Sequence, residues 1–493
     1  MHRHASKWGI CALAVAVAAT AGNLLAQDQS APSPGYPQAT DVQQAADTRP
    51  AADADRPPAP TAEDVANADL AKRVSDLEKK LDEAAKAAAA KPLVPAAPAK
   101  PLIAPSGRIQ MDAANYTQNT TSVNQIGNIP NAVGFRRARL ALLGGYEVVD
   151  YIIEMDFANR SSLSTANTKD ESVAFKDVYI QIKDLPLLGV VRVGHFKECF
   201  GLEDLTSDNY TTFMERSLCD EGAFCPGRNN GIMAYNWNES ERATWAIGAF
   251  TNQTGFDQPP LFQYDHWGLD MATRVTYLPW YDEASNGRGL LHTGLDYAYR
   301  SAPDDNMLFS TKPESGFANS VVSLNMAGVK QWQVADAESA LVYGPLSLQS
   351  EFFGATVERT TGANNNFYGC YAYASYFLTG EHRPYNRKLG VFDRVRPLEN
   401  FFRVRTCDGD TATGIGAWEL AYRFSYIDAL DGLANKGAGQ ATDHTFGVNW
   451  YMNPYTKVML NYVHSQDKYN PIAGTTLTGG SLDVIEMRFA MDF

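Results

Sequence analysis

The 493-residue chain has no run of eighteen or more apolar residues beyond its N-terminus, which excludes a membrane protein built from spanning helices. Its 42 basic residues are fewer than its 56 acidic ones, so a nucleic-acid partner is not expected. Catalytic motifs are missing as well: the sequence contains no GxSxG, HExxH, Walker A or zinc-type CxxC pattern. We therefore expect no enzymatic activity, metal or cofactor.

Glycine and aromatic residues, in contrast, are plentiful, with 38 Gly, 24 Tyr and 23 Phe. This mixture suits many strands joined by tight turns. A membrane β-barrel also remains possible, because the polar residues of its interior lower the average hydropathy that its apolar outer face would otherwise give.

The N-terminus is typical of an export signal. A positive start that includes Arg3 and Lys7 precedes a short apolar run from Gly9 to Ala19, and cleavage sites follow at Ala21 and Ala26. Eleven apolar residues are too few to span a membrane. We expect residues 1–26 to be a cleaved signal peptide, which places the mature protein outside the cytoplasm.

Three further segments precede the main domain. Residues 27–60 are rich in Ala, Pro and Asp and are expected to be a disordered linker. Residues 61–90 predict a short coiled-coil helix, because Leu70, Val74 and Leu77 begin a 4-3 apolar repeat. This helix would be either solvated and single or a contact to other copies, the periplasm or the cell wall. Residues 91–105 form a stiff Pro/Ala linker.

From residue 106 onward the sequence alternates with a period of two. In the last segment Met487, Phe489 and Met491 alternate with Glu486 and Arg488. The strands of a soluble sandwich also alternate apolar and polar residues. Three features favour a lipid-embedded barrel instead: charged residues in mid-strand, aromatic residues near strand ends, and short turns that alternate with long loops. A sheet that spans a membrane must close into a barrel, since hydrocarbon cannot form hydrogen bonds with the backbone groups at a free strand edge.

The pattern predicts an all-β fold, a closed antiparallel transmembrane β-barrel of about 16 strands over residues 106–493. The segment 319–330 is ambiguous. The predicted strands are 107–116, 134–147, 150–158, 174–183, 189–196, 230–238, 242–250, 268–277, 289–299, 334–343, 345–356, 368–378, 415–427, 443–452, 456–466 and 482–493.

Five cysteines remain after signal removal, an odd number for an oxidising compartment. Cys219 and Cys225 are close enough in sequence to staple one loop by a disulfide. The alternative is that all five are incidental, since spacing does not determine connectivity.

The barrel region resembles the phosphate-selective porins O and P. The matching stretches are FRRARLALLGGYEVVDYIIEMDFA (135–158), KDVYIQI (176–182), VGHFKECFGLEDLTSDNYTTFMERSL (193–218), AFCPGRNNGIM (223–233), YAYASYFLTGEHRPY (371–385) and GAWELAYRFSYIDAL (416–430). One departure is Cys199, where the family usually has Pro. The resemblance implies a sixteen-stranded, trimeric outer-membrane barrel with inward-folded segments and Arg and Lys side chains along an anion path.

An anion path needs local positive charge, and phosphate suits the planar fork of Arg. Residues 1–105 contain 11 basic and 12 acidic residues, which leaves 31 and 44 for the barrel, a net charge of −13. A uniformly basic lumen is therefore not expected, whereas a local basic cluster is compatible with this charge.

The segment 381–405 has a net charge of +4. Counting the predicted strands that precede it places its start at the periplasmic end of the barrel. The resemblance implies that this turn folds into the lumen; the alternatives are a solvated turn or contact with anionic lipid. Its candidate pore-lining residues are Arg383, Arg394, Arg396, Arg403 and Arg405.

Two more clusters complete the candidates. In the long loop 197–229, matching to the family nominates Arg216 and Arg228 for the constriction, although Glu215 and Arg216 could instead lock the loop by a salt bridge. In the run 136–139, alternation places Arg137 and Arg139 on one face, expected to be the lumen, and Arg136 on the other, near the strand end.

The sequence thus predicts an outer-membrane porin, a homotrimer in contact with lipid, that passes small anions such as phosphate or polyphosphate. One alternative is a general porin that lost anion selectivity, which the acidic barrel favours. The other is an envelope-linking barrel, held to periplasmic partners by residues 61–90.

Overall fold

The computed structural model describes residues 72–80, 82–83, 102–158, 173–220, 222–252, 268–405, 411–431, 433, 437–469 and 478–493. The chain divides into two compact units, residues 1–28 with 101–493 and residues 29–100. In the smaller unit, residues 72–80 and 82–83 are helical, and Val74 and Leu77 are exposed. The predicted signal peptide, the linker 27–60 and most of the segments 61–90 and 91–105 lie outside the described residues.

Within the described part of the chain, the helices are too short or too polar to cross a membrane.

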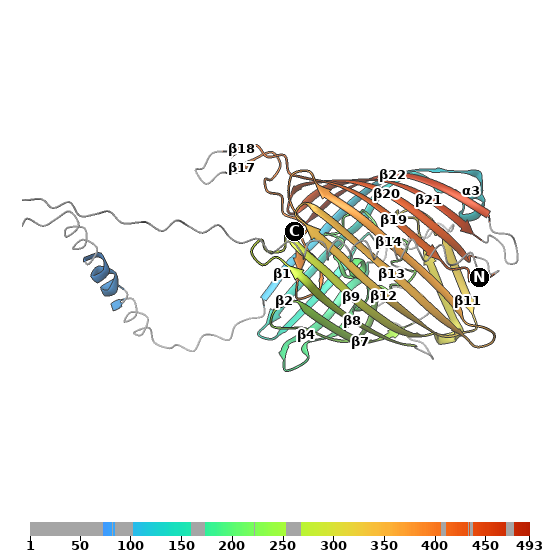
Figure 1. Cartoon of the computed structure of the whole chain (residues 1–493), viewed down its shortest axis with the longest axis horizontal. Coiled ribbons are helices and arrows are strands. Elements are labelled where there is room, and N and C mark those ends of the chain that lie inside the picture. Colours follow the sequence, from blue (N-terminus) through green and yellow to red (C-terminus); the bar gives the residue numbers. More distant parts are fainter. Residues whose placement is uncertain are drawn as a thin grey trace, which may run out of the picture. The chain divides into compact units, whose positions relative to one another are not determined.

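The larger unit is a closed barrel of sixteen strands (Figure 1) in which each strand pairs antiparallel with its neighbours and the last strand pairs with the first. The predicted fold class is confirmed, and every predicted strand overlaps a barrel strand. The barrel strands are β1 (Leu102–Gln118), β2 (Ala132–Tyr146), β3 (Val149–Asp156), β4 (Ala174–Leu185), β5 (Gly189–Lys197), β6 (Arg228–Trp237), β7 (Ala243–Asn252), β8 (Gly268–Tyr281), β9 (Gly289–Ser301), β12 (Val329–Tyr343), β13 (Leu346–Arg359), β14 (Asn365–Phe377), β19 (Ala417–Asp428), β20 (Gly439–Asn453), β21 (Thr456–Tyr469) and β22 (Thr478–Asp492).

The first strand begins earlier than the sequence pattern indicates. Residues 102–105, assigned above to the Pro/Ala linker, pair with residues 142–145 of β2. Leu102 and Ile103 are both exposed. The alternation was hidden there because Ala104 and Pro105 interrupt the apolar and polar pattern.

Strand β22 shows why the sequence alternates. Glu486 and Arg488 are 2% and 1% exposed, whereas Met487 and Phe489 are 50% and 47% exposed. This is the reverse of a soluble protein, because the apolar face of the strand is directed to lipid and the polar face to the barrel interior.

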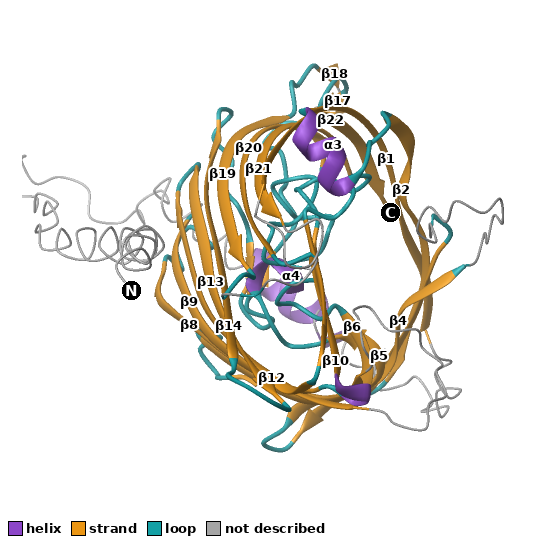
Figure 2. Cartoon of the chain, turned by 90° about the vertical axis from the view of Figure 1, so that its right-hand side faces the viewer, coloured by secondary structure: helices purple, strands orange, loops and turns teal. Residues whose placement is uncertain are grey.

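The lumen is partly filled by two inward-folded segments (Figure 2). One is residues 198–227 between β5 and β6, here called the inner loop, which carries the short helix α4 (Leu202–Leu205). The other is the hairpin of β10 (Asn306–Thr311) and β11 (Val322–Ala327), which lies outside the barrel sheet and accounts for the ambiguous segment 319–330.

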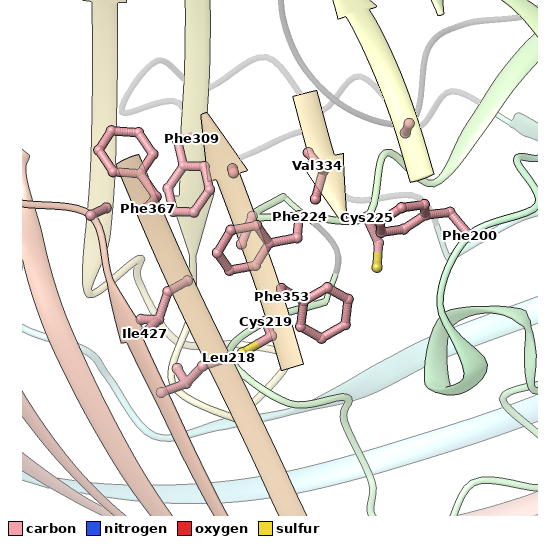
Figure 3. Packing of buried hydrophobic residues seen from close by; sticks show 14 of the residues in the cluster. Phe200, Leu218, Cys219, Phe224, Cys225, Phe309, Val334, Phe353, Phe367 and Ile427 are labelled. Atoms are coloured by element: carbon pink, nitrogen blue, oxygen red, sulfur yellow. The ribbon is translucent and has the colours of Figure 1, made fainter. Parts of the chain in front are cut away.

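These two segments pack against the inner wall through aromatic side chains. The ring of Phe224 stacks on Phe353 at 5.3 Å between centroids and meets Phe309 edge-on at 5.2 Å. Figure 3 shows this apolar cluster, which also contains Phe200 and Phe367. The two inward-folded segments therefore fill part of the lumen with a packed apolar core.

The remaining elements lie between barrel strands. Helix α3 (Thr120–Ile126) follows β1, and the 3-10 helix η1 (Pro303–Asp305) precedes β10. The pairs β15 (Tyr385–Asn386) with β16 (Val391–Phe392), and β17 (Val404–Arg405) with β18 (Thr411–Ala412), belong to the segment between β14 and β19.

Candidate functional site

The inner loop is fixed to the barrel wall by Glu215. Its carboxylate accepts two hydrogen bonds of 2.8 Å from Arg136 on β2 and one of 2.6 Å from Arg488 on β22. Burial alone would raise the pKa of Glu215, but the charges of Arg136, Arg488 and Arg137 outweigh it and lower that pKa. Glu215 is therefore a charged anchor near neutral pH.

Carboxylates of the wall also hold the backbone of the inner loop. The carboxylate of Asp296 on β9 accepts a hydrogen bond of 2.6 Å from the backbone amide of Gly201. Glu351 on β13 accepts the amides of Leu202 and Glu203 at 2.6 and 3.0 Å. These two wall carboxylates therefore position the backbone of the inner loop.

A cavity of about 250 Å³ lies between the inner loop and the wall formed by β4 to β8. Seven basic side chains and three carboxylates line it, so its local charge is opposite in sign to that of the whole chain. The basic residues are Arg108, Arg192, Lys197, Arg216, Arg228, Arg274 and Lys388, and the acidic ones are Asp177, Asp204 and Asp208.

Arg216 and Arg228 line this cavity from the loop and from the wall. Arg228 at the start of β6 forms two parallel hydrogen bonds to Asp177, at 3.2 and 3.0 Å. Arg216 contacts Asp208 at 2.7 Å and Asp220 at 3.2 Å. The loop-lock alternative paired Arg216 with Glu215; the structure instead gives these two neighbours separate partners.

Arg192 on β5 has a different environment. Its guanidinium lies 4.0 Å from the ring centre of Tyr179 and 5.4 Å from that of Tyr235. It donates hydrogen bonds to Gln181 at 2.9 and 3.1 Å, and no described carboxylate forms an ion pair with it. Neutral partners therefore orient this cation without cancelling its charge.

The other cations of the cavity are tied to the loop or the wall. Lys197 contacts Asp204, and Arg108 contacts Asp208 at 3.6 Å. Arg274 is bidentate to Glu338 at 2.7 and 2.8 Å. Three of these residues, Arg108, Arg192 and Arg274, were not predicted from the sequence. The signal available for each was a single Arg within a strand, at a position that alternation turns inward.

Asp208 is the acidic centre of this side of the loop. It lies 2.9 Å from Arg137 and 3.5 Å from Arg139. Burial would raise its pKa, but Arg137, Arg216 and Arg139 hold the pKa well below its usual value. Arg137 and Arg139 are thus on the lumen side as expected, but they support Asp208 and do not themselves line the cavity.

The expectation that Arg136 points away from the lumen was wrong. The pairing of β1 with β2 shifts register here: Gln110 pairs with Arg137 and Met111 with Phe135, so Arg136 is an extra, bulged residue. A bulge breaks the alternation of faces. Both Arg136 and Arg137 therefore reach the inner loop.

The predicted cluster 381–405 is divided by the structure. Arg383 is buried, with a hydrogen bond of 2.7 Å to Gln349 and its guanidinium 3.6 Å from the ring centre of Phe392. Arg394 binds Asp492 at 3.0 Å. Both lie apart from the residues that line the cavity.

The rest of this cluster lies farther along the segment. The side chains of Arg396 and Arg403 are exposed, and Arg405 belongs to β17, which extends beyond the barrel strands in Figure 1. From 381–405, Lys388 is the basic residue that lines the cavity.

The disulfide between Cys219 and Cys225 is not formed. Both are buried free thiols, as is Cys199. The thiol of Cys219 is directed to the carbonyl of Tyr426 at 3.4 Å, within the apolar core. Close spacing was misleading because the loop turns between the two residues and packs each separately. Cys370, in contrast, is disulfide-bonded.

Comparison with known proteins places these features in a family. The family model "Phosphate-selective porin O and P" matches residues 103–493. Porin O of Pseudomonas aeruginosa is 28% identical over 403 residues, covering 73% of this chain and 82% of that protein. An uncharacterised protein of Caulobacter vibrioides is 26% identical over 365 residues, covering 68% and 67%.

Solved structures of outer-membrane proteins also align with the chain. OmpT of Vibrio cholerae does so with a TM-score of 0.47 at 10% identity, covering 80% of this chain and 100% of that one. An anion-selective porin from Comamonas acidovorans does so with a TM-score of 0.46 at 13% identity, covering 80% and 100%.

Proposed function

Since the chain belongs to the phosphate-selective porin O and P family, a family of outer-membrane channels, we propose that it passes small anions by passive diffusion along the cavity beside the inner loop. Both the family and the fold point to a channel rather than to an enzyme.

The observation that carries this proposal is the charge of the cavity. Seven cations face three carboxylates there, although the whole chain has a net charge of −14. Fixed positive charge in a narrow space with a low-dielectric wall raises the local concentration of anions and lowers that of cations. The general, unselective porin is the weaker alternative, because basic residues outnumber carboxylates seven to three in the lining of the cavity.

Phosphate or polyphosphate is the solute that the donors fit best. The hydrogen-bond partners of Arg192 are the neutral side chains of Gln181 and Tyr235, so its positive charge remains available to a phosphate in the cavity. Arg216 and Arg228 already bind carboxylates, so each offers an anion only part of its hydrogen-bonding capacity. Binding of this kind is weak enough for release, which conduction requires.

The test is single-channel recording of the purified protein in planar bilayers under a salt gradient. We expect an anion-selective reversal potential and a chloride conductance that falls as phosphate is added. An unselective or cation-selective pore would refute the proposal. Anion selectivity without any effect of phosphate would leave an anion channel and refute phosphate as its solute.

Assembly and orientation follow from the same family. We propose a homotrimer in contact with outer-membrane lipid, exported by the segment 1–26, with the start of β1 at Leu102 and the end of β22 at Asp492 on the periplasmic side. Mass determination in detergent tests the trimer, and N-terminal sequencing of the mature protein tests the cleavage.

A further inference from the structure

Four carboxylates meet on the inner wall beneath the inner loop. The register of the sheet places Asp336 on β12 directly opposite Asp296 on β9, and Glu338 on β12 directly opposite Glu351 on β13. All four are buried. Like charges directly opposite each other destabilise a sheet, and burial away from water increases that cost.

Three of these carboxylates have clear compensation. Glu338 is bound by Arg274 and by His292, the latter at 2.8 Å. Glu351 and Asp296 accept amides of the inner loop. Arg274 and His292 are the basic side chains on the described residues that contact this group.

Asp336 is the exception. It is only 3% exposed, no N–H or hydroxyl group of a described residue donates to either of its carboxylate oxygens, and its carboxyl lies within hydrogen-bonding reach of the carboxyl of Glu351. One oxygen of Asp296 lacks a donor as well. A buried polar group without a partner costs free energy. These oxygens must therefore bind a cation or carry a proton in the folded protein.

The geometry suits an ion. One oxygen from each of Asp296, Asp336 and Glu338 lies within 4.8 Å of the others. Calcium–oxygen distances run from about 2.3 to 2.6 Å, so two oxygens on opposite sides of one Ca²⁺ are about 4.6–5.2 Å apart. The three oxygens therefore fit around a single ion, with water completing its shell.

We propose that Asp296, Asp336 and Glu338 bind a hard divalent cation, Ca²⁺, which braces the base of the inner loop. The donors are all carboxylates, which excludes a preference for zinc or copper. Mg²⁺ is the weaker competitor, because it demands near-ideal octahedral geometry at shorter distances. The ion would neutralise the acidic pair at Asp336 and Asp296, and Asp296 would transmit its position to Gly201.

The test is a Ca²⁺ titration of the full-length protein, in detergent, after removal of lipopolysaccharide and stripping with a chelator. Isothermal calorimetry should give saturable binding of one Ca²⁺ per chain, and Tb³⁺ luminescence should report the same site by competition. Asp336→Asn should weaken binding at least tenfold while retaining heat-modifiable migration, the sign of a folded barrel.

Asp467→Asn is the matched control. Asp467 is a buried acid on β21 with one unbonded oxygen, outside the proposed site, and its substitution should leave the stoichiometry and affinity unchanged. Absence of saturable Ca²⁺ binding by the wild-type protein, or equal binding by Asp336→Asn, would overturn the proposal. If Asp336→Asn fails to fold, Asp336→Ala serves in its place, and the wild-type titration decides on its own.

Discussion

Arg136 and Glu215 face each other through two parallel hydrogen bonds of 2.8 Å, although strict alternation would turn Arg136 toward lipid. The bulge in β2 makes this contact possible, since it adds one residue opposite β1. Arg488 completes the arrangement from the last strand at 2.6 Å. The inner loop is thereby tied to both sides of the seam where the barrel closes.

Substitution of Glu215 by Gln should destabilise the barrel and loosen the passage. It leaves Arg136 and Arg488 without their common carboxylate, and loss of one partner from a buried ion pair costs about 3–5 kcal/mol. We expect a lower denaturant midpoint and a larger, noisier single-channel conductance. Glu239→Gln, at an exposed site, is the control, and equal behaviour of both variants would show that Glu215 is not an anchor.

The contribution of Glu215 should depend on pH in one direction. Its pKa in the folded protein lies below the ordinary value of 4.5. A depressed pKa gives stability that is fully present above the ordinary pKa and is lost as the pH falls toward the folded one.

The difference in unfolding free energy between wild type and Glu215→Gln should therefore be constant from pH 7 to about pH 5 and shrink below about pH 4.5. Denaturant titrations at pH 7, 5 and 3 measure it. A difference that grows on acidification would contradict the assigned pairing.

Selectivity should fall most when Arg228 is removed. Arg228→Ala deletes one positive charge and also exposes the carboxylate of Asp177, which the arginine now binds at 3.0 Å. Arg192→Ala deletes a charge without exposing an acid, and its effect on the reversal potential should be smaller. The double variant Arg228→Ala with Asp177→Ala should recover part of the loss.

Arg396→Ala provides the control for these measurements, because Arg396 is exposed and does not line the cavity. An equal shift of the reversal potential for Arg396→Ala and Arg228→Ala would remove the cavity from the mechanism. Arg216→Ala should shift the reversal potential less than Arg228→Ala, because Arg137 and Arg139 still hold Asp208 after Arg216 is removed.

The barrel could be predicted from the sequence, because each strand carries its own period-two pattern, and β22 shows it without interruption. The contents of the lumen could not. The inner loop and the β10–β11 hairpin are apolar where they meet the wall, yet nothing local shows that Phe224 will stack on Phe353, 129 positions away in the chain.

The candidate site was only partly accessible for the same reason. Arg216 and Arg228 were found through the family motif. Arg192 carries only the weak signal of one cation between two valines, and the bulge at Arg136 has no signal in composition. A dense basic cluster was the stronger pattern at 381–405, but Arg396 and Arg403 are exposed and do not line the cavity.

The three buried thiols should be unreactive in the folded protein. Burial raises the pKa of Cys199, Cys219 and Cys225, which removes the nucleophilic thiolate, and none is accessible to a reagent. Maleimide labelling followed by mass spectrometry should modify these three only after unfolding, without any reductant. A linked peptide containing Cys219 and Cys225 would contradict the structure.

The start of β1 at Leu102 decides how the N-terminal unit can be removed. Residues 102–105 pair with β2, so deletion of 27–101 preserves every barrel pairing, whereas deletion of 27–105 removes four. We expect the first variant to conduct with wild-type selectivity. The second should unfold at a lower temperature, since each lost hydrogen bond costs about 1 kcal/mol.

The same pair of deletions separates a channel from a tether to the envelope. If the segment 61–90 serves only to attach the barrel to periplasmic partners, the 27–101 deletion should lose co-sedimentation with the cell wall and keep its conductance. Conductance that disappears in a deletion whose barrel still shows heat-modifiable migration would mean that the N-terminal unit takes part in permeation. In that case the cavity beside the inner loop would not be sufficient for transport, and residues of the N-terminal unit would also be needed.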